Sequence, residues 1–145
     1  KIAISPENKN TLVVTDFKTG KSYTTWEAKD SEYTKIKLHF YQYQLAYYKL
    51  LIKNSRTYKN YNLDVGQIEF IEADDNEKIN VLKLDLDEEF VTRVEKLANI
   101  IYNKIVNLDF PDTTKYTHTE NGKEKDEIKL SDILDFEEDL LSGRI

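Results

Sequence analysis

The chain contains no cysteine and no methionine, and only four glycines and two prolines occur among its 145 residues. Without cysteine there is no disulfide framework, no cysteine-ligated zinc site, no iron–sulfur cluster held by this segment and no thiol nucleophile. The sequence also has no phosphate-binding loop, no glycine-rich dinucleotide fingerprint and no serine elbow. No apolar run approaches the roughly 20 residues of a membrane span, and no signal-peptide pattern opens the chain.

The length fits a single domain that can bury a core without disulfide or metal support. The lack of cysteine and of a signal pattern leads us to expect a cytoplasmic protein. Because the chain starts at Lys1 and has no methionine, we expect it to be a fragment with residues missing upstream.

Charge is distributed unevenly along the chain. Residues 1–60 carry 11 Lys and Arg against 5 Asp and Glu, a net of +6, whereas residues 61–145 carry 10 against 22, a net of −12. The total of −6 argues against a nonspecific DNA coat, because such binding depends on basic patches. The first half still leaves room for a local basic face, and ordinary solvated surface is the simpler alternative.

Two β-hairpins are expected from the pattern of β-branched and aromatic residues. The first joins strands at 1–5 and 11–19 through a turn at 6–10 that contains proline and asparagine. The second joins strands at 63–73 and 79–86, where apolar residues partly alternate.

Two longer helices and one short helix are also expected. The first covers 35–54, which holds no glycine or proline and has apolar residues at helical spacing. The second starts after Asp87, a good N-cap, and ends near residue 107. Residues 113–129 are expected to be mobile, and a short acidic helix capped by Ser131 follows. The order β-β-α-β-β-α plus a tail predicts an α/β or α+β domain with a mixed sheet.

Asp16 and Lys18 are the first candidate site residues. Side chains two apart on a strand point to the same face, so an acid and a lysine come together at the end of an apolar strand. A carboxylate suits Mg²⁺, and a nearby lysine can orient or help deprotonate an attacking water and offset charge on a phosphate. A weak surface ion pair is the simpler alternative.

Gln44 and Tyr48 form a second candidate pair, because positions i and i+4 share one helix face. A glutamine in an otherwise apolar helix needs hydrogen-bond partners, such as a nucleic-acid backbone or an active-site carboxylate. The simpler alternative places Gln44 at the solvent edge of the helix.

Aromatic residues and lysines alternate in the first half, which suits either a single-strand groove or a core flanked by lysines. We favour the core for most of the helical residues. His39 and His118 do not suggest a metal pair, and residues 137–139 are expected to form a solvated acidic face. The aromatic residues are Tyr23, Trp26, Tyr33, Phe40, Tyr41, Tyr43, Tyr47 and Tyr48, and the lysines are Lys21, Lys29, Lys35, Lys37, Lys49 and Lys53.

The segment 13–21 reads VVTDFKTGK, and a later helix carries QLAYY at 44–48. Together they resemble the RecB-like branch of the PD-(D/E)XK nucleases, in which a strand with D-[FY]-K-[ST]-G precedes a helix with Q-x-x-x-Y. The second hairpin and the long helix ending at 108–112 look like the nuclease domain that closes UvrD-like helicases of the AddA/RecB type. The resemblance covers about residues 1–112.

The resemblance implies a restriction-endonuclease-like core over 1–112, with a mixed central sheet flanked by helices, followed at 113–145 by a charged linker and a short acidic helix. It makes Asp16 a catalytic, metal-binding carboxylate and the backbone carbonyl of Phe17 a further metal ligand. Lys18 would be the catalytic lysine. Gln44 and Tyr48 would complete the catalytic site and, with Lys21, contact DNA.

The implied activity is Mg²⁺-dependent phosphodiester hydrolysis, with Mn²⁺ as a possible substitute. The domain would be a DNA exonuclease or deoxyribonuclease of an ATP-dependent helicase-nuclease that acts in double-strand-break repair and recombination. ATP would act only in the helicase part, and no iron–sulfur cluster is implied. Expected partners are DNA (linear duplex ends or single strands), the helicase domains of the same chain and a second subunit, with no membrane. Two alternatives stay open: an inactive nuclease-like module for DNA binding or subunit docking, and a stand-alone phage-type exonuclease.

One feature of the family is missing. Its members carry another metal-binding aspartate on the preceding strand, in a Gly-x-x-Asp context, and often a histidine on an earlier helix. Residues 1–5 contain no acid, and Glu7 in the following turn is a poor substitute. We therefore expect the N-terminal part of the domain to be missing and the chain alone to lack part of its metal site.

Overall fold

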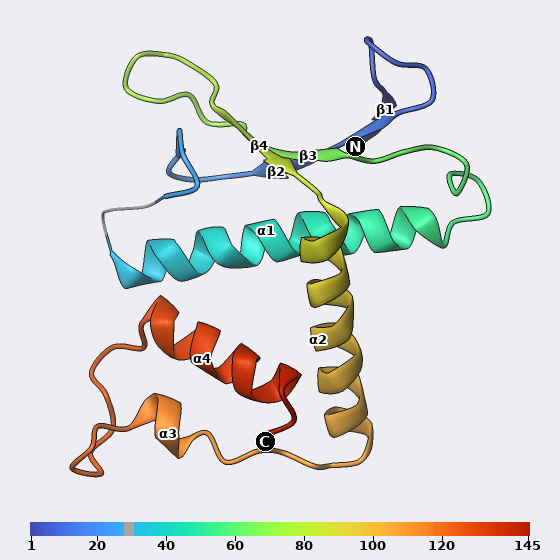
Figure 1. The fold of residues 1–145 in the computed structure, drawn as a ribbon. Coiled ribbons are helices and arrows are strands. Elements are labelled where there is room, and N and C mark those ends of the chain that lie inside the picture. The colour runs from blue at the N-terminus through green and yellow to red at the C-terminus, as the bar shows by residue number, and fades with distance from the viewer. Residues whose placement is uncertain (28–30) are drawn as a thin grey trace.

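The computed structural model describes residues 1–27 and 31–145 (Figure 1). It confirms an α/β domain with a mixed sheet. Of the candidate cations, Lys29 lies outside the described residues. In chain order the elements are β1 (Ile2–Ile4), β2 (Leu12–Lys18), α1 (Glu32–Lys53), β3 (Val65–Phe70), β4 (Val81–Asp85), α2 (Glu88–Val106), α3 (Thr114–Thr117) and α4 (Leu130–Leu141).

The four strands form one sheet in the order β1-β2-β3-β4. Strands β1 and β2 are antiparallel, as are β3 and β4, so both predicted hairpins are confirmed. Strands β2 and β3 are parallel, which requires a crossover connection, and α1 supplies it. In this register Asp16 lies beside Ile68 of the central strand β3.

Helix α1 lies along one face of the sheet, α2 leaves the sheet and crosses α1, and α4 lies on the side of α1 away from the sheet (Figure 1). On β3 every second residue is buried, as the two-residue period requires: Gly66, Ile68 and Phe70. The apolar core includes Leu12, Val14, Leu38, Leu45, Ala46, Leu50, Ile68, Phe70, Leu82, Leu86, Val91 and Val94.

Gly66 of β3 allows α1 to pack closely on the sheet. A Cβ atom at this position would lie 3.2 Å from the Cβ of Leu45 and 3.3 Å from Cδ1 of Leu86. A larger residue would push α1 outward. The close approach matters because β2 and α1 together carry the candidate site residues.

Capping side chains set the starts of α1 and α2. Ser31 caps α1 by accepting a 3.2 Å hydrogen bond from the backbone of Thr34, so this helix begins at Glu32, three residues earlier than expected. Asp87 caps α2 as predicted, and its carboxylate accepts a 2.8 Å hydrogen bond from the backbone of Phe90.

Helix α4 corrects two predictions. It begins at Leu130 with Lys129 as its N-cap residue, so Ser131 is not the cap. The expected solvated acidic face is wrong for two of its three residues, because Glu137 is 6% exposed and Asp139 is 4% exposed, whereas the side chain of Glu138 is 59% exposed. The two buried acids turn inward to meet cations and hydroxyl groups.

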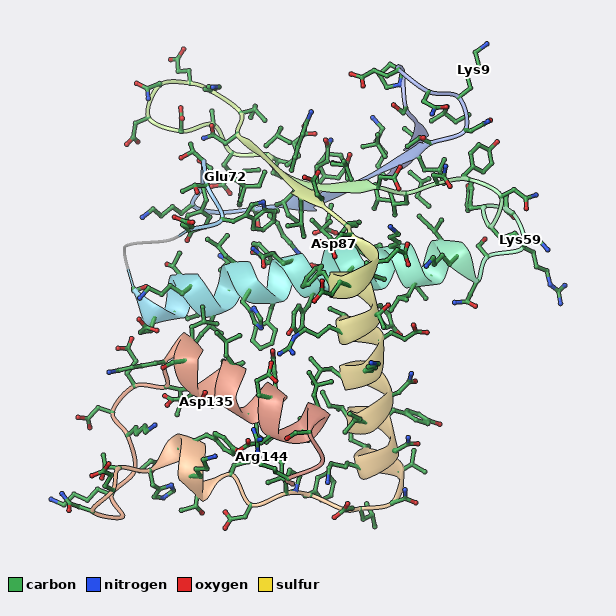
Figure 2. All side chains as sticks on the ribbon, in the orientation of Figure 1. Lys9, Lys59, Glu72, Asp87, Asp135 and Arg144 are labelled. Atoms are coloured by element: carbon green, nitrogen blue, oxygen red, sulfur yellow. The ribbon has the colours of Figure 1, made fainter. Side chains whose placement is uncertain are left out.

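Asp139 is held by the segment that precedes α4. Its carboxylate accepts hydrogen bonds of 2.6 Å from both Lys115 and Tyr116. It also pairs with Arg144, which follows α4 and is labelled in Figure 2. Residues 113–129, expected to be mobile, therefore contain α3 and the buried Tyr116.

Within the described residues, no helix combines the length and the apolar character that a membrane crossing requires.

Candidate active site

The structure brings four predicted site residues together at the carboxyl end of β2. Tyr48 donates a 2.9 Å hydrogen bond to Oδ1 of Asp16, and Lys18 Nζ lies 2.8 Å from Oδ2 of the same carboxylate. Lys18 also donates a 2.8 Å bond to Gln44 Oε1, and Gln44 Nε2 donates a 2.8 Å bond to the hydroxyl of Tyr48. These contacts close a ring, which we call the Asp16–Lys18–Gln44–Tyr48 ring.

Two sequence periods build this ring. Asp16 and Lys18 are two apart on β2 and share the face that Leu12 and Val14 bury against α1. Gln44 and Tyr48 are one turn apart on α1 and share the face that meets the end of β2. The simpler alternatives, a surface ion pair and a solvent-edge glutamine, do not describe these contacts.

Within the described residues, one carboxylate oxygen of Asp16 has a hydrogen-bond donor and the other has none. Oδ1 accepts the hydrogen bond from Tyr48, whereas Oδ2 is buried and accepts no hydrogen bond of good geometry within the described residues. The ammonium of Lys18, 2.8 Å away, offsets part of the negative charge on this oxygen. A buried carboxylate oxygen without a proper donor is a place where a cation can bind.

Lys18 is surrounded by groups that stabilise its positive charge. Besides Asp16 and Gln44, the ring of Tyr41 lies beneath the ammonium, with its centroid 4.4 Å from Nζ. Tyr41 lies three residues before Gln44 on α1, and the sequence reasoning did not single it out from the other aromatic residues. Its spacing from Gln44 is the signal that could have done so.

The hydroxyl of Tyr48 keeps its proton. Burial raises the pKa of this phenol, and the hydrogen bond to the Asp16 carboxylate raises it further. Tyr48 is therefore a stable hydrogen-bond donor, and it holds Asp16 Oδ1 in place.

The backbone carbonyl of Phe17 points to an uncovered strand edge. The carbonyl of Lys18 bonds to β3 through the backbone of Ile71 at 3.0 Å, and that of Thr15 bonds to the amino group of Lys1 at 2.8 Å. Because carbonyl groups alternate along a strand, Phe17 shares the side of Thr15, where β1 pairs only as far as Val14 of β2. This carbonyl suits the role that the resemblance implies for it.

A hollow of about 260 Å³ opens onto Asp16 and Tyr48, between β1 and the second half of α1. The register that pairs Ile2 with Val14 puts Lys1 beside Thr15, at the wall of this hollow. A residue attached ahead of Lys1 would continue this register opposite Asp16.

These groups meet the minimum demands of Mg²⁺, which takes oxygen ligands, keeps several waters and often uses one or two protein carboxylates plus substrate phosphates. Asp16 Oδ2 and the Phe17 carbonyl are the two oxygens that would hold it. No group of three or more His, Cys, Asp or Glu side chains within the described part of the chain is arranged to hold a metal ion. Within the Asp16–Lys18–Gln44–Tyr48 ring, Asp16 supplies the carboxylate.

Other candidate residues lie elsewhere. Lys21 follows Gly20 at the end of β2, with its ammonium 5.8 Å from the ring centroid of Tyr23. Lys49 is buried and donates to the carbonyl of Leu86, and Lys53 pairs with Glu88 at the start of α2. These last two lysines support packing of α1 on α2.

The two histidines do not meet, as expected. His39 bonds to Glu137 at 2.8 Å, and His118 bonds to the hydroxyl of Thr117 at 2.8 Å. Glu7 is exposed in the turn between β1 and β2, so it does not replace a metal-binding acid.

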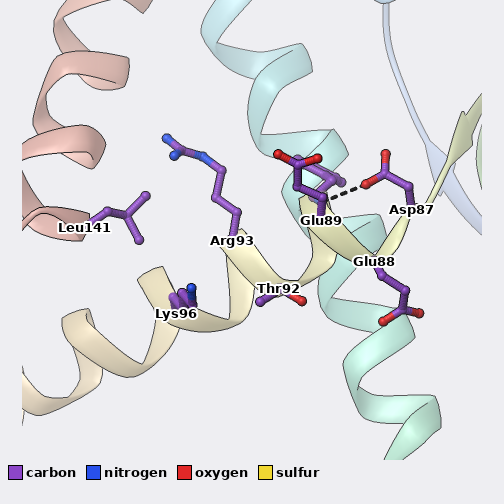
Figure 3. Close-up of a pocket in the computed structure, with 8 residues that line it drawn as sticks. Asp87, Glu88, Glu89, Thr92, Arg93, Lys96 and Leu141 are labelled. Carbon is purple, nitrogen blue, oxygen red and sulfur yellow. Dashed lines mark hydrogen bonds between the residues drawn. The ribbon is translucent and has the colours of Figure 1, made fainter.

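A second hollow of about 710 Å³ shares no residue with the ring. Figure 3 shows that its lining comes from the first turns of α2, including Asp87 and Arg93, and from Leu141 at the end of α4. Its acids and cations have packing roles, since Asp87 caps α2 and Arg93 pairs with Glu138 at 2.6 Å. The ring at the end of β2 is therefore a stronger candidate for a catalytic site than this hollow.

No protein-family model, curated protein or solved structure matches the chain.

Proposed function

We propose that this chain is the Mg²⁺-dependent DNA nuclease domain of an ATP-dependent helicase-nuclease that processes double-strand breaks. The observation that carries the proposal is the closed Asp16–Lys18–Gln44–Tyr48 ring. Four residues that the nuclease pattern requires, taken from two elements, share one network. The parallel β2-α1-β3 unit that presents them supports a restriction-endonuclease-like core.

Each residue has a defined task in phosphodiester hydrolysis. Asp16 Oδ2 and the Phe17 carbonyl would hold Mg²⁺, which would supply a water of lowered pKa and neutralise charge on the phosphate. Lys18 orients the attacking water and stabilises the negative charge that develops on the phosphate oxygens. Gln44 fixes the Lys18 ammonium, and Tyr48 fixes the Asp16 carboxylate.

Gln44 and Tyr48 also hold the charged groups of Lys18 and Asp16 in place before a substrate binds. Each one bonds to the other and to one charged residue of β2. The charged groups therefore do not need to reorient when a substrate arrives. A DNA backbone that enters the hollow beside Asp16 would meet Tyr48 at its wall.

A second candidate function is a nuclease-like module that binds DNA or a partner subunit without cleaving it. The contact that favours this alternative is the one between Lys18 and Asp16, because Lys18 Nζ lies 2.8 Å from the oxygen that a metal would need.

The experiment compares DNA degradation by the full-length natural protein and by Lys18→Ala, with linear DNA and Mg²⁺. Loss of one positioned acid–base group lowers a rate by about 10²- to 10⁴-fold. Lys83→Ala is the matched control, because Lys83 is an exposed lysine on β4. Equal degradation by wild type and Lys18→Ala would refute the catalytic assignment. DNA binding without any degradation by wild type would establish the second candidate.

A further inference from the structure

The side-chain stripe on α1 that forms the site continues beyond Gln44. Lys37 and Tyr41 precede it at helical spacing, so Lys37, Tyr41, Gln44 and Tyr48 follow one another along a single face. The ammonium of Lys37 lies 5.7 Å from the ring centroid of Tyr41, and that of Lys18 lies 4.4 Å from the same ring. One tyrosine ring therefore contacts both Lys37 and the candidate catalytic lysine.

Lys37 differs from neighbouring lysines in its partners. Lys35 pairs with Glu32 at 2.5 Å and Lys53 pairs with Glu88 at 2.7 Å. No carboxylate within the described part of the chain pairs with Lys37, whose ammonium instead lies 5.7 Å from the ring centroid of Tyr41 and 6.0 Å from that of Tyr23. An aromatic face attracts a cation without neutralising its charge. Within the described structure the charge of Lys37 is therefore not compensated by an ion pair.

Two like charges held next to each other are costly unless an anion joins them. The substrate of the proposed reaction carries phosphates at regular intervals along its backbone, so a phosphate at Lys18 has another one next to it. A single small phosphate ester would leave the second cation unused. The pair of lysines therefore fits a polynucleotide better than a mononucleotide.

We propose that Lys37 binds the phosphate next to the one that is cleaved, and that Tyr41 is the positioning residue that holds Lys37 and Lys18 at the right separation. This inference rests on the proposed nuclease function, since the neighbouring phosphate is defined by the one at Lys18. It names a second phosphate-binding position in the site and assigns residues to it.

The test measures how oligonucleotide binding by the full-length natural protein depends on salt, in the presence of EDTA so that no cleavage occurs. Removal of one phosphate-binding lysine reduces the slope of log K against log salt by about one. Lys37→Ala should show this loss, whereas Lys35→Ala, the matched control on the same helix, should keep the wild-type slope. An unchanged slope for Lys37→Ala would overturn the proposal.

A second pair of variants tests Tyr41. Tyr41→Phe keeps the aromatic face, so it should retain the wild-type salt slope, whereas Tyr41→Leu removes the face and should reproduce the slope of Lys37→Ala. Equal behaviour of Phe and Leu would remove Tyr41 from the proposal. Because binding is measured without Mg²⁺, its outcome is separate from hydrolysis. A slope loss in Lys37→Ala together with unimpaired cleavage by Lys18→Ala would reject the catalytic assignment and retain the binding position.

Discussion

Removal of the Glu137 carboxylate should destabilise the domain more than removal of the acid next to it. Glu137 lies on α4, with a side chain that is only 8% exposed. His39 bonds to it at 2.8 Å and Tyr43 at 2.5 Å, both from α1, and Arg93 of α2 bonds at 3.3 Å. One carboxylate thus joins three helices.

The expected loss in free energy of unfolding follows from the polar groups that would lose their hydrogen-bond partner in Glu137→Ala. The hydroxyl of Tyr43 and the ring of His39 would both lose their partner, whereas Arg93 would keep its 2.6 Å bond to Glu138. A buried polar group left without a partner costs about 1–3 kcal/mol, so two such groups cost about 3 kcal/mol. At about 1.4 kcal/mol per factor of ten, the folding equilibrium constant should fall by about 100-fold.

Urea denaturation measures this effect. With a typical slope of about 2 kcal/mol per molar, the midpoint for Glu137→Ala should fall by about 1.5 M. Glu138→Ala is the matched control, because that side chain is 59% exposed and pairs only with Arg93 in the structure described here. A surface ion pair is worth at most about 1 kcal/mol. If the two variants lost the same small amount of stability, the packing of α4 against α1 and α2 would be wrong.

Two further predictions concern packing and pH. Gly66→Ala should lower stability by about 1 kcal/mol in urea denaturation, because the added Cβ meets Leu45 at 3.2 Å and overpacking outweighs the gain in strand propensity; a more stable variant would contradict the close approach of α1. Bonds from Lys115 and Tyr116 hold the pKa of Asp139 well below its usual value of 3.8. This carboxylate therefore stabilises the folded state above about pH 4, and the stabilisation is lost as the pH falls through the folded pKa. The protection factors of the backbone amides in α4 against hydrogen exchange should fall in acid, and Asp139→Asn should weaken that dependence; equal dependence in both proteins would reject the assignment.

Local patterns predicted the elements and the candidate site well. The spacing Asp16-x-Lys18 needs only a strand to bring an acid and a lysine together, and Gln44 and Tyr48 need only one helical turn. The contact between the two pairs depends on packing of α1 across β2, which a β-α-β crossover enforces. The ring therefore follows from local rules and one topological step, although its chemical role stays a prediction.

Helix α4 shows that local sequence patterns do not predict contacts between distant helices. Glu137 meets His39 across 98 residues of sequence, and no local pattern reports that distance. A run of three acids normally faces solvent, so composition favours the wrong interpretation. Burial of the Glu137 carboxylate is favourable because His39, Tyr43 and Arg93 bond to it. These three residues belong to other helices.

The same packing bears on whether a chain of net charge −6 can attract a polyanion. Charges act over about 8–10 Å at physiological salt, so the nearest groups determine the field at the site. Lys18 and Lys37 share the Tyr41 ring, and Asp16 is the one carboxylate in contact with them in the described structure. The buried acids of α4 lie on the far side of α1 and are paired with cations of their own, as Glu137 is with Arg93. The groups in direct contact there therefore carry two positive charges against one negative charge, despite the sign of the total. If DNA binds at the end of β2 as proposed, lower ionic strength should strengthen that binding.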